Sequence, residues 1–161
     1  MIVSSATGEL PPGVRAGTIH AGCVLLGEAG VLIRGGSGTG KSALARRLVH
    51  RWNGMGIFAK WVADDRTNIA SSGGRLVARP VPPLAGRSEI RGLGIVAVPH
   101  EPAAVIRIIL DCNSKEPQRF PGGDTTTAEL AGVVLPRLVL RVDADAEHMV
   151  AAALLPHVTS R

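Results

Sequence analysis

The sequence has few of the residues that mark membrane, disulfide-rich or nucleic-acid-binding proteins. Its 161 residues include two cysteines and no tyrosine, and aromatic residues make up 2% of the chain. No apolar run approaches the roughly 20 residues that a membrane helix needs. Nucleic-acid binding usually combines a basic stripe with aromatic side chains, whereas the 18 Lys and Arg residues form no block. These absences exclude a membrane span and argue against a nucleic-acid partner.

The first 17 residues, MIVSSATGELPPGVRAG, lack the basic start and apolar core of a secretory signal. We therefore expect a cytoplasmic protein with no membrane partner. Cys23 and Cys112 form no CxxC pair and stand near no histidine cluster, so we expect two buried free thiols. The formal net charge of +5 favours a phosphate-bearing or acidic partner.

Apolar segments alternate with turn-forming segments along the chain, and this alternation predicts an α/β fold. We expect one domain over residues 1–161, with a mainly parallel central sheet flanked by helices and a loose lead-in over 1–15. The predicted elements are a hairpin over 18–30, strands over 31–34, 57–65, 88–98, 104–111 and 137–143, an edge strand or loop over 75–86, a loop over 114–124, and helices over 41–52 and 144–155.

A glycine-rich turn, GGSGTGKS, lies between a predicted strand and a predicted helix and matches the pattern G-x-x-x-x-G-K-[ST]. Glycine lets backbone N–H groups converge on phosphate oxygens, and the helix adds the positive end of its dipole. Lys41 supplies a mobile cation, and the Ser42 hydroxyl is a ligand for Mg²⁺. The turn predicts a nucleoside triphosphate bound with Mg²⁺. Its residues are Gly35, Gly36, Ser37, Gly38, Thr39, Gly40, Lys41 and Ser42.

Carboxylates that could hold Mg²⁺ or orient a nucleophile follow two apolar strands. Asp64 and Asp65 end one strand and Asp111 ends another, and the pattern allows either site. Glu89 and Arg91 lie two residues apart, so on a strand they share a face. They could bind a metal and phosphoryl oxygens, or form a cross-strand ion pair on the surface.

Three segments, taken in order, resemble the HPr kinase/phosphorylase family. They are TIHAGCVLLGEAGVLIRGGSGTGKSALA, WVADDR and EIRGLGIVAV, and the resemblance covers roughly residues 17–142. The glycine turn alone is unspecific, whereas VADDR followed by the signature EIRGLGI is highly specific. The resemblance implies a P-loop kinase core that uses ATP and Mg²⁺ to phosphorylate a seryl hydroxyl of HPr, the phosphocarrier of the sugar phosphotransferase system.

The resemblance also implies roles for individual residues. Asp64 matches the catalytic aspartate, which acts as base in the kinase direction. His20 lies where the family carries a functional histidine, although a lone histidine in a strand is more often structural. Arg119 resembles a loop arginine near the phosphates, or is a solvated loop residue. The remaining matches are Lys41 as the catalytic P-loop lysine, Ser42, Glu89 and Asp65 at the metal, and Arg91 as the signature arginine.

The chain also departs from the family pattern. It looks like a shortened catalytic domain without the family's N-terminal domain, and an acidic segment, residues 143–148, replaces a basic turn. Such regions serve HPr docking, assembly and reverse phosphorolysis in the family, so we expect weak phosphorolysis and leave a homo-oligomer open. Two alternatives to a seryl kinase remain: a nucleotide-responsive module that binds a phosphocarrier without phosphotransfer, and another P-loop small-molecule kinase.

Overall fold

The structure is a computed structural model that describes residues 3–113, 115 and 117–155. It contains the two predicted helices, but most strands follow one another without a helix between them. Residues 114 and 116 of the expected 114–124 loop lie outside the described residues. The strands are β1 (Val3–Ser5), β2 (Ala16–His20), β3 (Gly22–Leu26), β4 (Ala29–Gly35), β5 (Ala59–Ala63), β6 (Arg66–Ser72), β7 (Arg75–Pro80), β8 (Arg87–Ile90), β9 (Gly94–Ala97), β10 (Ala104–Cys112), β11 (Thr127–Leu130) and β12 (Val133–Leu140), and the helices are α1 (Lys41–Gly54) and α2 (Ala146–Leu154).

The large sheet is mixed, so the prediction of a mainly parallel sheet is wrong. Its strands run in the order β1-β2-β6-β7-β10-β4-β3-β5, and β12 joins β10 to β11. Strand β10 pairs in parallel with β4 and β12, but neighbours such as β3 and β4 or β6 and β7 are antiparallel. The reason is the connections: a parallel pair needs a long crossover, whereas Gly73–Gly74 closes a two-residue hairpin with positive φ at both glycines.

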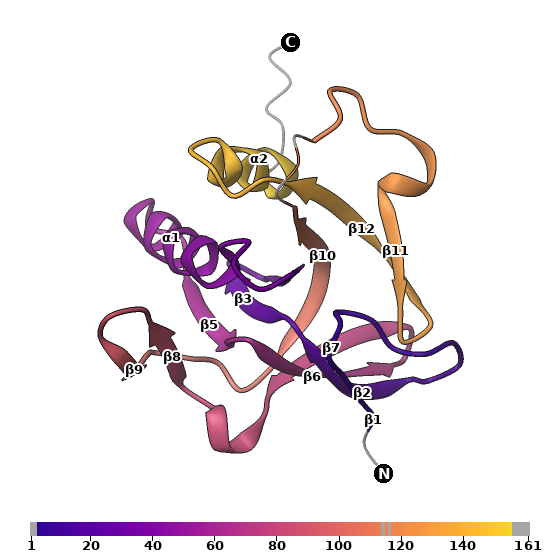
Figure 1. The fold of residues 1–161 in the computed structure, drawn as a ribbon, viewed down its shortest axis with the longest axis horizontal. Coiled ribbons are helices and arrows are strands. Elements are labelled where there is room, and N and C mark those ends of the chain that lie inside the picture. The colour runs from indigo at the N-terminus through magenta and orange to yellow at the C-terminus, as the bar shows by residue number, and fades with distance from the viewer. Residues whose placement is uncertain (1–2, 114, 116, 156–161) are drawn as a thin grey trace.

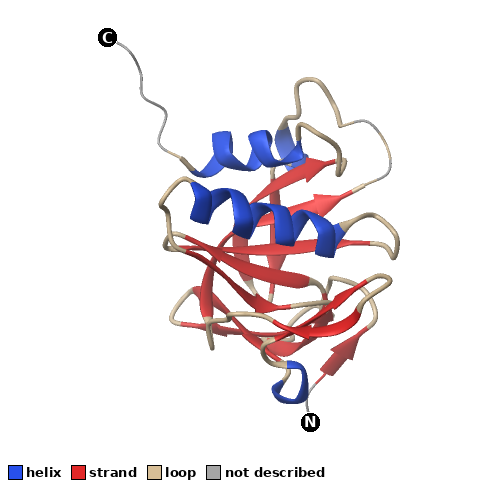
Figure 2. Cartoon of the chain, turned by 90° about the vertical axis from the view of Figure 1, so that its left-hand side faces the viewer, coloured by secondary structure: helices blue, strands red, loops and turns tan. Residues whose placement is uncertain are grey.

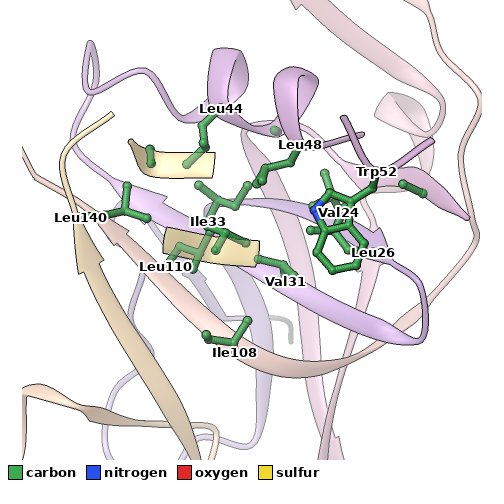
Figure 3. Close-up of a cluster of buried hydrophobic side chains, with 14 of the residues drawn as sticks. Val24, Leu26, Val31, Ile33, Leu44, Leu48, Trp52, Ile108, Leu110 and Leu140 are labelled. Atoms are coloured by element: carbon green, nitrogen blue, oxygen red, sulfur yellow. The ribbon is translucent and has the colours of Figure 1, made fainter. Parts of the chain in front are cut away.

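Both helices lie on one side of the sheet, rather than flanking it (Figure 2). Helix α1 turns an apolar stripe of Leu44, Leu48 and Trp52 toward the strands, because these residues are spaced four apart and share one helix face (Figure 3). Val31 and Ile33 of β4 point to this helical side, while Leu32 between them packs with the second core on the opposite face. The strand before the glycine turn is thus buried on both faces and forms a rigid base for it.

Strand β10 connects two parts of the sheet. Its first residues pair with β7 and its last four pair with β12, so β10 runs from the lower strands to the strands beneath the helices (Figure 1). Strand β7 is therefore an inner strand, although Pro80 led us to expect an edge strand or loop over 75–86. Pro80 is tolerated because it is the last residue of β7.

Three further expectations need correction. The hairpin expected over 18–30 is formed by β3 and β4, while β2 pairs with β1 and β6. The strand expected over 88–98 is a separate hairpin of β8 and β9, because Gly92 between the strands and Gly94 at the start of β9 adopt positive φ. The lead-in expected to be loose contributes strand β1.

Cys23 and Cys112 are buried and free, as predicted. Burial raises the pKa of both thiols, that of Cys112 to about 12. Both thiols therefore stay protonated and inert at neutral pH. Neither helix among the described residues is long and apolar enough to cross a membrane.

Candidate functional site

The glycine turn connects the end of β4 to the start of α1. Gly35, Gly38 and Gly40 adopt φ of 147°, 80° and 89°, which L side chains rarely adopt. A Cβ on Gly35 would stand 2.6 Å from the Cys112 carbonyl oxygen. The backbone can follow this path only with glycine at these positions, and the first helical N–H groups remain at its end for an anion.

Lys41 and Thr39 hold the turn through a single carbonyl. The Lys41 ammonium donates to the Gly36 oxygen over 3.0 Å, and the Thr39 hydroxyl donates to the same atom over 2.7 Å. Lys41 is 8% exposed and has no carboxylate partner among the described residues. A nearly buried ammonium held only by a carbonyl can exchange that contact for a phosphate oxygen.

Asp64 lies at the centre of the polar contacts beside the turn. Its Oδ1 accepts from the Ser42 hydroxyl over 2.8 Å, and its Oδ2 accepts from the Ser88 hydroxyl over 2.9 Å and the Glu89 N–H over 3.2 Å. The three donors come from α1 and β8, and Asp64 itself directly follows β5. The structure thus brings together the glycine turn, the aspartate pair and the signature segment.

Asp65 turns away from Asp64 because its own φ is +65°, a left-handed conformation that aspartate tolerates better than most residues. Its carboxylate lies 3.5 Å from His20 Nδ1. The two adjacent aspartates therefore reach different partners, Ser42 and His20, from a single tight turn.

A cavity of about 500 Å³ opens between these groups, and we call it the Lys41 cavity. Three cationic and three anionic side chains line it, together with the turn and the first residues of α1. Its charged residues are Lys41, Arg46, Arg91, Asp64, Asp65 and Glu89.

A second cavity of about 820 Å³, here the Asp111 cavity, adjoins the first half of the glycine turn and is lined by His20. Arg34 donates from Nε and Nη2 to the two oxygens of Asp111 over 2.7 and 2.8 Å, and from Nη1 to the Gly8 carbonyl over 2.9 Å. Arg137 also donates to Asp111. Burial acts to raise the pKa of Asp111, but the hydrogen bonds and charges of both arginines outweigh it and lower that pKa.

Asp111, the alternative to the aspartate pair, differs from that pair in its partners. Its carboxylate is occupied by two guanidinium groups, and it lines the cavity that Ser42 does not reach. Arg119 is not brought to either cavity: it is exposed, and its guanidinium lies 5.5 Å from the centre of the Phe120 ring. Glu89 and Arg91 both line the Lys41 cavity and form no ion pair with each other within the described chain.

Sequence reasoning missed three contributors to the site. Ser88 is 3% exposed and donates to Asp64, and its only signal is its place beside Glu89. Arg46 lines the Lys41 cavity, although the sequence alone gives no reason to separate it from Arg47 and Arg51 of the same helix. No sequence pattern singles out Arg34, because an arginine at a strand end is usually solvated.

The donor set of the Lys41 cavity fits Mg²⁺. Ser42, Asp65 and Glu89 offer hydroxyl and carboxylate oxygens, and Mg²⁺ in such sites keeps several waters and takes only one or two carboxylates plus phosphate oxygens. No cluster of three or more His, Cys, Asp or Glu side chains stands ready for a metal among the described residues. These oxygen ligands are therefore typical of a metal ion that binds together with phosphates, rather than one that is coordinated by protein alone.

Comparison with known proteins gives consistent matches. The family model described as "HPr Serine kinase C-terminal domain" matches residues 14–153. HPr kinase/phosphorylase of Streptococcus sanguinis is 34% identical over 137 residues, which cover 78% of this chain and 42% of the relative. That of Chromobacterium violaceum is 32% identical over 130 residues, covering 73% and 39%. The matched region thus spans less than half the length of these curated relatives.

A solved structure shows the same fold. The HPr(Ser) kinase/phosphatase from Coxiella burnetii superposes with a TM-score of 0.65 at 22% identity, over 84% of this chain and 91% of that chain.

Proposed function

Because the chain belongs to the HPr serine kinase C-terminal domain family, we propose that it is an ATP-dependent kinase that phosphorylates a serine hydroxyl of an HPr-like phosphocarrier protein in the cytoplasm. One observation carries this proposal: Ser42 of the glycine turn and Asp64 of the aspartate pair share a hydrogen bond of 2.8 Å at the mouth of a charged cavity. Phosphoryl transfer needs a phosphate cradle and a carboxylate side by side.

The glycine turn and Lys41 bind the triphosphate in this proposal. The N–H groups of the turn and the start of α1 point to phosphate oxygens. Lys41 gives up the Gly36 carbonyl and contacts the β- and γ-phosphates. Because the ammonium is nearly buried, its charge acts on the phosphates with little screening by water.

Ser42, Asp65 and Glu89 would hold Mg²⁺ beside the phosphates. The bound metal would neutralise charge on the transferring group and orient it. Asp65 stays available for this role because its contact with His20, at 3.5 Å, is long.

Asp64 is the proposed base. The attacking serine oxygen forms a bond to the γ-phosphorus, the bond from that phosphorus to the bridging oxygen breaks, and ADP leaves with the bonding electrons. The serine proton passes to the Asp64 carboxylate. A carboxylate has about four acceptor positions, and three donors already occupy Asp64. The remaining position lies on Oδ1, on the side of Ser42, and we assign the substrate hydroxyl to it.

The test is transfer of labelled phosphate from ATP to a purified HPr protein. We expect Asp64→Asn to lower the transfer rate about 10²- to 10⁴-fold, the usual contribution of a general base, with nucleotide affinity nearly unchanged. The matched control is Glu28→Gln, since Glu28 is an exposed carboxylate outside both cavities.

Three results would contradict parts of the proposal. A wild-type chain that binds ATP and HPr without transferring phosphate is a regulatory module instead. Transfer to a small molecule but not to HPr indicates another P-loop kinase. A nearly normal Asp64→Asn variant beside an inactive Asp65→Asn variant reverses the roles of the two aspartates.

A further inference from the structure

Helix α1 carries three arginines, and the structure separates them. Arg47 pairs with Glu147 of α2 and donates to the Asp143 carbonyl over 2.9 Å, and Arg51 lies 3.8 Å from the same glutamate. Both therefore bind α1 to α2. Arg46 instead lines the Lys41 cavity.

The position of Arg46 follows from helix geometry. It lies four residues after Ser42, so the two side chains share a helix face one turn apart. Side chains on a helix also lean toward its N-terminus. Arg46 therefore leans back toward Ser42, over the cavity that Asp64 and Glu89 close from the opposite strands.

Arg46 is partly buried, yet it forms no hydrogen bond or ion pair with any described residue. A guanidinium carries five N–H donors in a planar fork that matches the oxygens of phosphate. Lys41 already contacts the Gly36 carbonyl of the turn. A phosphate group in the cavity would then have Lys41 on the side of the turn and Arg46 on the side of the helix face.

We propose that Arg46 binds the phosphate group on the acceptor side of the Lys41 cavity, the group that is being transferred or has just been transferred. This inference rests on the proposed function, because it assumes that the glycine turn holds the nucleotide. In this proposal a residue of α1 binds the terminal phosphate and does not contact the nucleoside diphosphate.

The experiment uses the full chain with two probes. Calorimetry measures Mg-ADP binding, and ³¹P line broadening measures binding of inorganic phosphate to the chain saturated with Mg-ADP. We expect Arg46→Ala to weaken phosphate binding about 10- to 100-fold, the scale of hydrogen bonds to a charged group. Mg-ADP affinity should change less than about twofold, since the lost contacts are those of the guanidinium with the terminal phosphate.

Two further variants make the result specific. Arg46→Lys keeps the positive charge but loses the planar N–H donors of the guanidinium. Its phosphate affinity should therefore fall between those of the wild type and Arg46→Ala. Arg51→Ala removes an equal charge from the same helix outside the cavity, so it should bind phosphate like the wild type. Thermal melting of each variant confirms that the fold is intact.

The other outcomes are decisive. The role of Arg46 is overturned if Arg46→Ala binds phosphate as tightly as the wild type does. It is also overturned if the variant loses affinity for Mg-ADP and for phosphate to the same extent. If the wild-type chain binds Mg-ADP but no phosphate, the role of Arg46 is overturned as well, while the proposed function is not contradicted. Wild type that binds no Mg-ADP overturns the proposed function and this inference with it.

Discussion

The Lys41 cavity and the Asp111 cavity lie on either side of one glycine turn, and Ser37 lines both. In the larger Asp111 cavity the two central arginines are already paired, since Arg34 and Arg137 both bind Asp111. In the smaller Lys41 cavity Arg46 and Arg91 have no partner among the described residues. Judged by volume alone, the larger Asp111 cavity would be taken as the functional site. The unpaired arginines point to the smaller cavity, because a phosphate group needs cations that are not already paired.

The pairing in the Asp111 cavity serves the turn indirectly. Arg34 directly precedes Gly35 and connects β4 with β10 and with the Gly8 carbonyl of the N-terminal segment. The buried ion group therefore fixes the strand end from which the glycine turn begins. The ion group of the Asp111 cavity thus stabilises the backbone at the turn, whereas the Lys41 cavity contains the groups that could act on phosphate.

The largest effect on activity is expected from Lys41→Ala. Nucleotide binding and phosphate transfer should be lost, because the variant removes the buried cation closest to the turn. The free energy of unfolding should fall by only about 1 kcal/mol, the value of one hydrogen bond. Calorimetry with Mg-ATP and urea unfolding measure the two effects, with Lys60→Ala as a surface lysine control. Unchanged nucleotide affinity would show that the turn does not bind phosphate.

In the Asp111 cavity we expect the opposite pattern. Asp111→Asn leaves two arginines without their carboxylate, and breaking a buried pair costs about 3–5 kcal/mol. We expect about 3 kcal/mol, the lower end of that range, because the Arg137 side chain is 28% exposed. Urea unfolding measures the loss, and the nucleotide affinity of the folded fraction should fall far less than in Lys41→Ala, because Asp111 supports the turn without lining the Lys41 cavity. A variant as stable as the wild type, with weakened nucleotide binding, would show that this cavity binds the ligand.

A smaller effect is expected from acid. The pKa of Asp111 is lower in the folded chain than in the unfolded chain, so its contribution is complete above the unfolded pKa, about 3.9. The contribution is lost as the pH falls through the folded pKa. The difference in unfolding free energy between wild type and Asp111→Asn should therefore be constant near neutral pH and shrink below about pH 4. Urea unfolding from pH 7 to pH 3 tests this, and a constant difference would mean that the charge of Asp111 does not stabilise the fold.

Local patterns led to much of the candidate site. The spacing of GGSGTGKS and its place between strand and helix indicate the phosphate turn, and Asp64, Asp65 and Glu89 are found by their positions after strands or in the signature segment. Pattern could not separate Asp64 from Asp111, because both follow apolar strands. Only the partners differ: hydroxyls for Asp64, and arginines for Asp111.

The sequence by itself determined the two helices, the strand before the glycine turn and the turn itself, and that Cys23 and Cys112 are buried. These properties follow from neighbouring residues and from hydrophobic spacing. The tertiary structure alone decided that the sheet is mixed, that Arg46 faces a cavity while Arg47 binds Glu147, and that Asp111 is neutralised. The physical reason is range: a turn or a helix depends on contacts within a few residues, whereas the partner of a charge comes from strands that lie 77 positions apart, as in Arg34 and Asp111.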